Sequence, residues 1–210
     1  MKRSTLLLLL LAMFLLLFGA LFSLSDFKLQ RAEMAVESSA STYAFGDNGN
    51  GSGLQTKALD LYVRAPAMIE SELIQALRDA LDTNPYVGRI ELRQSPPAAG
   101  EESVLVLTME DPQSLFWTPV YARAALTVDV AYASDGEVEW IGEEVVVLEA
   151  QEPPAARVVR VRGEYNFEGT AYGLISRPGY ATYLAGEVAQ TVNQALADTL
   201  TAQYTPLSQQ

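Results

Sequence analysis

Few residues of this chain have the type and spacing that catalysis or metal binding requires. Its 210 residues include neither histidine nor cysteine, which removes the commonest general base, thiolate nucleophiles and thiolate metal sites. Two pairs of adjacent acids remain, Glu101-Glu102 and Glu143-Glu144. Neighbouring residues of a strand point to opposite faces, so Glu143 and Glu144 are not expected to act on one substrate. Acids in a loop are ordinary solvated groups, and we predict no catalytic residue, metal site or cofactor.

A lysine that acts as nucleophile or base would have to be Lys57, the only lysine after Lys28. Such chemistry needs a lysine that is buried and held neutral. Lys57 lies where a tether is expected to meet the folded domain, so we favour a structural role for this side chain.

Two arginines, Arg160 and Arg162, are the candidates for a charged binding site. They alternate with apolar residues in the sequence VVRVRGEYNFE, which places them and Glu164 on one face of a strand. In so acidic a chain they could bind an anion or a carboxylate. The interpretation that we favour is ion pairing with acids of a neighbouring strand, because oppositely charged cross-strand neighbours stabilise a sheet.

Aromatic side chains in the second half of the chain form the other candidate site. Tyrosine and tryptophan are enriched in protein interfaces, but packing within or beside the core is the interpretation that we favour. We expect any functional surface in the loop 111–119 and in the segment 169–183. The candidate partner surface consists of Phe116, Trp117, Tyr121, Tyr172, Tyr180 and Tyr183.

The formal charge excludes one class of partner. The whole chain carries −12, and once the first 31 residues are set aside, 10 basic and 25 acidic residues leave −15. Such a surface repels phosphate backbones, so we expect no nucleic-acid partner. It also repels anionic lipid headgroups, so we do not expect the domain to lie flat on a bilayer.

The strongest signal of the sequence is an uncharged apolar run over residues 4–24. About 20 helical residues span a hydrocarbon core of roughly 30 Å, and Lys2 and Arg3 orient the N-terminus toward the cytoplasm. We favour an uncleaved signal-anchor over a signal peptide cleaved near Ser25, because signal peptides have shorter apolar regions. The domain is then expected on the outer side of the cell membrane, or secreted or periplasmic after cleavage. A lipid anchor is not expected, because it needs a cysteine.

We predict five regions along the chain. The linker among them rests on a Ser-, Gly- and Asn-rich composition, and its sequence DNGNG has too few carboxylates for a calcium loop. The regions are a cytoplasmic positive segment (1–3), a transmembrane signal-anchor or signal peptide (4–25), a juxtamembrane helix and flexible linker (26–57), an extracytoplasmic domain (58–204) and a frayed tail (205–210).

Hydrophobic periodicity predicts the first half of the domain. Apolar residues alternate with polar ones over 59–63, the pattern of a half-buried strand. Apolar residues at i, i+4 spacing over 69–81 predict an amphipathic helix. Two further strands are expected at 86–93 and 104–109.

The second half is predicted to contain a long hairpin over residues 120–147. Residues 120–132 alternate as one strand, and the sequence SDG that ends in Gly136 is a hairpin turn signal. We favour a three-residue loop with Gly136 in the left-handed conformation, because that register pairs Val130 with Trp140 and keeps apolar residues together.

A strand over 159–167 and a helix over 181–200 complete the domain. The fold class is therefore predicted to be α+β, a two-layer sandwich of two helices on a mostly antiparallel sheet of four to six strands. A single transmembrane or signal helix precedes it.

Three of these features together resemble the small α+β domains of bacterial envelope lipoproteins. They are the helix after the first strand, the hairpin over 120–147 and the strand–helix ending. Lipopolysaccharide-assembly lipoproteins and the auxiliary lipoproteins of transport systems are examples of that class. The resemblance covers residues 58–203 and is one of topology, and the chain departs from the class in lacking the lipid-bearing cysteine. It implies the fold and an envelope setting but no functional residue.

Two functions remain after these exclusions. The one that we favour is a membrane-tethered, extracytoplasmic, non-enzymatic domain with a binding or accessory role among envelope proteins, and it predicts an uncovered sheet edge or an aromatic patch. The alternative is a secreted enzyme or small-ligand-binding protein with a pocket between helices and sheet. That alternative predicts a cavity lined by inward polar groups. The sequence leaves the oligomeric state open.

Overall fold

The computed structural model describes residues 3–24, 28–46, 57–97, 102–110, 112, 114–141, 144–146 and 157–204. The described part is an α+β protein, which confirms the coarse fold class. Its elements in chain order are α1 (Arg3–Leu24), β1 (Lys28–Phe45), β2 (Lys57–Arg64), α2 (Glu70–Leu81), β3 (Val87–Arg93), β4 (Ser103–Met109), β5 (Ser114–Thr118), β6 (Tyr121–Ala133), β7 (Glu139–Ile141), β8 (Glu144–Val146), β9 (Val158–Ile175) and α3 (Arg177–Tyr204).

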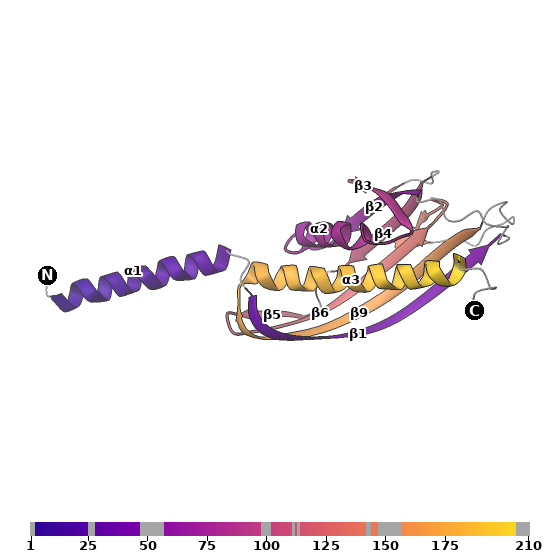
Figure 1. Cartoon of the computed structure of the whole chain (residues 1–210). Helices are drawn as coiled ribbons and strands as arrows, with labels where there is room; N and C mark the ends of the chain where they lie inside the picture. The colour runs from indigo at the N-terminus through magenta and orange to yellow at the C-terminus, as the bar shows by residue number, and fades with distance from the viewer. Residues whose placement is uncertain are drawn as a thin grey trace.

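One mixed sheet of seven strands organises the domain (Figure 1). Its order is β1-β9-β6-β4-β2-β3, and β5 pairs with β6 beside that path. β2 runs parallel to both β3 and β4, whereas the other pairs are antiparallel. The predicted two-layer sandwich on a mostly antiparallel sheet of four to six strands is therefore wrong in strand number and pairing. The β2–β3 pair is parallel because α2 carries the chain back across the sheet between these two strands.

β1 contradicts the predicted juxtamembrane helix and flexible linker over residues 28–45, whereas residues 47–56 of that predicted region lie outside the described residues. Residues 28–45 form one strand that pairs antiparallel with β9 along its whole length, from Lys28 opposite Ile175 to Phe45 opposite Val158. The Ser- and Ala-rich middle of this strand is exposed, so it needs no run of apolar residues. The backbone groups of β1 that face β9 are paired with it, which a local composition rule does not register.

The predicted hairpin over residues 120–147 is also wrong. β6 pairs with β4 and β9, so that Val130 lies between Leu107 and Gly163, and Trp140 pairs with Val145 in the separate β7–β8 ladder. The turn itself forms as expected, since Gly136 has φ 73°. The chain leaves the sheet after this turn because β9 offers β6 a much longer antiparallel partner.

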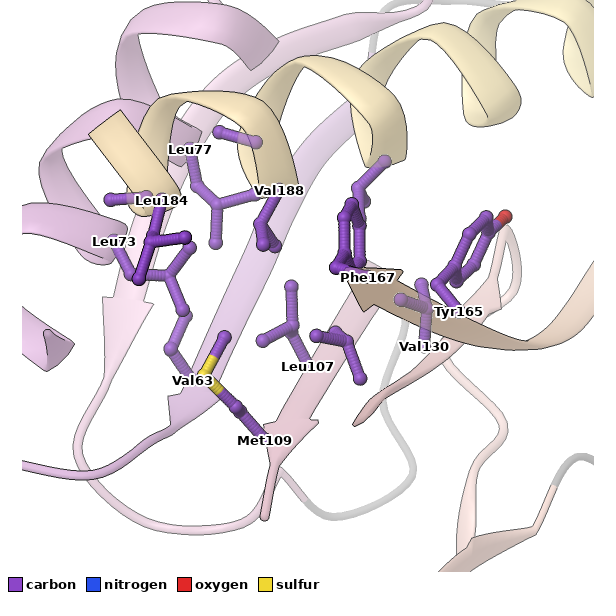
Figure 2. Close-up of a cluster of buried hydrophobic side chains, with 14 of the residues drawn as sticks. Val63, Leu73, Leu77, Leu107, Met109, Val130, Tyr165, Phe167, Leu184 and Val188 are labelled. Carbon is purple, nitrogen blue, oxygen red and sulfur yellow. The ribbon is translucent and has the colours of Figure 1, made fainter. Parts of the chain in front are cut away.

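The core lies between one face of the sheet and the helices α2 and α3 (Figures 1 and 2). The i, i+4 stripe of α2 buries Leu73, Leu77 and Leu81, and Figure 2 shows Leu77 close to Val188 of α3. Glu70 and Glu72 in the first turn of α2 stabilise the helix, because their negative charges lie near the positive end of its dipole. Past its C-terminal end, the amide of the buried Asn84 donates a hydrogen bond of 2.8 Å to Asn193 and so ties α2 to α3.

The opposite face of the sheet is covered over a smaller area. A second apolar cluster there joins β4, β6 and the turn after β6, and it consists of Val104, Val106, Ala131, Ala133 and Val138. Toward the other end of β6 and β9 this face carries polar and aromatic residues that reach solvent. The sheet therefore has one face under helices and one face that is open over part of its length.

α1 lies beyond the end of the sheet at which β1 begins (Figure 1). It is a helix of 22 residues with the sequence RSTLLLLLLAMFLLLFGALFSL. None of the helices in the described part of the chain is both long and apolar enough to span a membrane.

Truncation of Leu77 tests the packing of α2 against the sheet. Leu77 is fully buried, so Leu77→Ala should lower the free energy of unfolding by about 2–5 kcal/mol through lost burial and a residual cavity. Gln75→Ala, on the exposed side of the same helix, should change it by less than about 0.5 kcal/mol. Urea unfolding followed by circular dichroism measures both. Equal effects of the two substitutions would contradict the packing described.

Candidate functional site

An exposed aromatic patch lies on the open face of the sheet, at the end where β1 begins. We define the aromatic patch as Phe116, Val120, Tyr121, Tyr172 and Leu174. The ring centroids of Phe116 and Tyr121 are 6.0 Å apart, and those of Tyr121 and Tyr172 are 5.2 Å apart, both in tilted arrangements. Tilted rings at these distances attract each other through their quadrupoles. The three rings therefore form a continuous surface.

Strand register places these rings side by side. Tyr121 is the cross-strand neighbour of Tyr172, and Phe116 that of Arg123. The tight turn from β5 to β6 is fixed by the hydroxyl of Thr118, which donates to the carbonyl of Tyr121 and accepts from its N–H, both at 2.9 Å. These hydrogen bonds hold the tip of the turn against the end of β9.

Backbone contacts lock that tip to β9. The carbonyl of Val120 accepts a hydrogen bond of 3.1 Å from Gly173, and the carbonyl of Pro119 accepts one of 3.1 Å from Ile175. Gly173 has φ 111°, a conformation open to glycine and strained for other residues. The patch is thus presented by strands and a bonded turn, which gives it a fixed shape.

The structure separates the six predicted aromatic residues into two groups. Phe116, Tyr121 and Tyr172 form the exposed rings of the patch. Trp117, next in sequence to Phe116, points to the other face, where its indole N–H donates 3.2 Å to the carbonyl of Ile175. Alternation along β5 is the physical reason, because successive side chains of a strand face opposite sides.

Tyr180 and Tyr183 belong to the core and not to a surface. They are buried on α3 with ring centroids 6.2 Å apart, and the hydroxyl of Tyr180 donates 3.4 Å to the carbonyl of Gly169. Burial raises the pKa of Tyr180, and burial followed by the charge of Glu187 raises the pKa of Tyr183 to about 12. Both lie on the apolar stripe of α3, a helical signal that the sequence already contained.

Arg160 forms an ion cluster on the partly open face. Its guanidinium donates to Asp135 at 2.6 and 3.3 Å and to Glu137 at 2.6 Å, and it lies 6.0 Å from the ring centroid of Phe45. The side chain of Arg160 is 2% exposed. These acids come from the turn after β6. The sequence pattern had instead predicted acids of a neighbouring strand as the partners of Arg160.

Ser134 positions Asp135 for this contact. Its hydroxyl accepts 2.9 Å from the N–H of Val159, and its own N–H donates 3.0 Å to the carbonyl of Val159. Arg162 lies two residues further along β9, exposed on the same face. The structure therefore brings Arg160 to a carboxylate cluster that belongs to this chain, and Arg160 and Arg162 do not form a joint anion site.

An open groove of about 400 Å³ adjoins the aromatic patch. It combines the guanidinium of Arg123 with carboxylates, and so offers complementary charges to a polar group of either sign. Its lining residues are Glu33, Met34, Ala35, Tyr121, Arg123, Glu168, Gly169 and Thr170. Across the described part of the chain, no cluster of three or more acids could hold a metal ion.

Several residues weighed from the sequence lie outside the described residues. They are Glu101, Glu143 and residues 47–51, together with the side chains of Lys57 and Glu144. Between the helices and the sheet, the described side chains form one apolar cluster. Of the buried polar residues, Asn84 bonds to Asn193, and Ser176 accepts from the N–H of Gly179 at 3.0 Å. This apolar packing between the helices and the sheet disfavours a polar pocket there.

The raised pKa of Tyr183 predicts a loss of stability at high pH. Burial raises the pKa of Tyr183 in the folded state to about 12, whereas in the unfolded chain the phenol loses its proton near the ordinary tyrosine pKa of 10.0. The contribution is therefore present below pH 10 and lost as the pH rises from 10 to 12. Tyr183→Phe should flatten this decline in the free energy of unfolding. Parallel pH profiles for parent and Tyr183→Phe would contradict the assignment.

Removal of Arg160 tests the ion cluster. The side chains of Asp135 and Glu137 are 23% and 66% exposed. Water can therefore replace part of the hydrogen bonding that these carboxylates lose when Arg160 is removed. We expect Arg160→Ala to lower the free energy of unfolding by about 1–3 kcal/mol. Arg162→Ala, exposed on the same strand, should cost less than about 0.5 kcal/mol. A double-mutant cycle with Asp135→Ala measures the coupling, and a coupling of zero would refute the contact.

Comparison with known proteins gives matches among solved structures. No protein-family model and no curated protein matches the chain. Two solved structures of PelC dodecamers from Paraburkholderia phytofirmans match at 12% identity and a TM-score of 0.34. The match to a PelC variant covers 74% of this chain and 98% of that chain, and the match to PelC itself covers 75% and 96%. Similarities at this level carry no argument about this chain.

Proposed function

We propose that this protein is a membrane-tethered, extracytoplasmic, non-enzymatic domain that binds or assists other proteins of a cell-envelope complex. The proposed anchor is residues 4–25, whose run of apolar residues follows Lys2 and Arg3. That charge pattern leaves the N-terminus in the cytoplasm and the C-terminal domain outside. Cleavage near Ser25 would instead release the domain as a secreted or periplasmic protein.

The observation that carries the proposal is the open outer edge of β1. β1 ends the strand order, and among the described residues it pairs only with β9 along its 18 residues. Residues 35–42 of this strand are exposed. An edge that presents unpaired N–H and C=O groups is a template for a strand of another chain. A long edge free of proline and lysine over residues 29–45 therefore supports a protein partner.

The acidic charge supports the choice of partner class. A formal charge of −15 after residue 31 disfavours nucleic acids, which leaves proteins as the macromolecular class that we propose. We also propose that the domain is similar in fold to the small α+β domains of envelope lipoproteins. The β2–α2 beginning and the β9–α3 ending of that predicted topology have counterparts in the structure, whereas its central hairpin does not.

Capture of partners from intact membranes tests the proposal. The full chain, isolated from cross-linked membranes of its source, should bring down at least one envelope protein. We expect the proline variants Ser38→Pro and Ser39→Pro to behave differently from each other. Adjacent residues of an edge strand direct their N–H alternately inward and outward, so one proline breaks a bond to β9 and the other changes only the open edge.

The proline variant that keeps the thermal midpoint of the parent is the informative one, and the other is its control for misfolding. We expect the stable variant to lose the captured protein. Capture that is unchanged by the stable variant would remove the β1 edge from the proposal. Recovery of no envelope protein by the parent chain would contradict the proposed function itself.

A further inference from the structure

We propose that the aromatic patch rests in the headgroup region of the bilayer in which α1 is anchored. This inference deepens the proposed function, because it depends on the membrane tether. It assigns the patch to lipid, and it leaves the edge of β1 to a protein partner.

The position of the patch is the first argument. α1 ends at Leu24 and β1 begins at Lys28, so four residue steps limit the distance between these ends to about 14 Å. Lys28 pairs with Ile175, whose N–H bonds to the carbonyl of Pro119 in the β5–β6 turn. The tip that carries Val120 therefore lies at the end of the sheet closest to α1 (Figure 1).

The concentration of apolar surface at this end is the second argument. Outside α1, six large apolar or aromatic side chains of the described residues are exposed, and four of these belong to the patch. Phe116, Val120, Tyr172 and Leu174 are 55%, 61%, 54% and 43% exposed. A contiguous exposed patch of this kind marks an interaction surface. Tyrosine in particular favours the boundary between lipid and water, where its ring is apolar and its hydroxyl is hydrated.

The order of charges along the open face is the third argument. Arg123 lies one row further from α1, as the cross-strand neighbour of Phe116 and Thr170. Glu33 shares that row and forms an ion pair of 2.9 Å with Arg31, which lies beside Tyr172. The acids Glu168, Glu164 and Asp129 follow beyond that row. Cations next to the apolar tip suit the depth of lipid phosphates, and the acids beyond the row lie further out where anionic headgroups repel them less. We therefore infer that the end of the sheet near α1 contacts the lipid headgroups and that the rest of the open face does not.

The absence of cysteine from the chain makes a direct test possible. Single spin labels are placed at Val120→Cys and Leu174→Cys, which keep all three rings of the patch, in the full chain reconstituted into phosphatidylethanolamine–phosphatidylglycerol vesicles. Accessibility to oxygen, which enters lipid, is compared with accessibility to a water-soluble nickel chelate. The matched control is Glu164→Cys on the same face of β9, about 34 Å from Leu174 along the strand.

We expect the ratio of oxygen to nickel accessibility to be several-fold higher at positions 120 and 174 than at position 164. Ratios equal to that of the control would overturn the inference. Low accessibility to both reagents would also overturn it, because a second copy of the chain would then cover the patch. A fourth label at Leu15→Cys reports on α1: a lipid-embedded label leaves the proposed tether standing when the patch labels fail, and a label in water refutes the tether itself.

Discussion

β9 is the strand on which the rest of the structure depends. It pairs with β1 over all 18 of its residues and with β6 over the 13 residues of that strand. The ladder with β9 pairs the inward-facing backbone groups of β1 and so holds in place a strand that has few apolar residues. The ladder between β6 and β9 sets the register that brings Tyr121 beside Tyr172 and Val130 opposite Gly163. Without β9, neither the edge of β1 nor the aromatic patch would have a defined shape.

The two faces of this sheet have different physical roles. The helical face buries the apolar residues of β2, β4, β6 and β9 under α2 and α3, and that burial is the main stabilising contribution. The open face carries the polar residues, the Arg160 cluster and the aromatic patch. Because side chains alternate along every strand, the packing of one face decides which residues the other face presents.

The link between α1 and the domain is shorter than the sequence predicts. A flexible segment of some thirty residues would let the domain move well away from α1. In the structure, β1 starts four residues after α1 ends, and residues 28–45 belong to the sheet. A short link restricts the orientation of the domain as well as its distance, and one end of the sheet consequently stays near the end of α1.

Local patterns predicted those elements whose evidence lies within a few residues. The i, i+4 stripe of α2, the alternation of β2 and β6, and the left-handed conformation of Gly136 follow from such spacing. The composition alone also excluded histidine and cysteine chemistry. Burial of Tyr180 and Tyr183 was readable from their places on the stripe of α3.

Only the tertiary structure decided the strand partners and, with them, the candidate site. Lys28 and Ile175 are neighbours in the sheet although 147 positions separate them in the chain. A Ser- and Ala-rich segment is a linker by composition and a strand when a long partner lies beside it. The pairing of β5 with β6 likewise decides that Phe116 lies on the open face of the sheet and Trp117 on the other face. Periodicity shows that a strand has two faces, and only packing shows which of them meets the core.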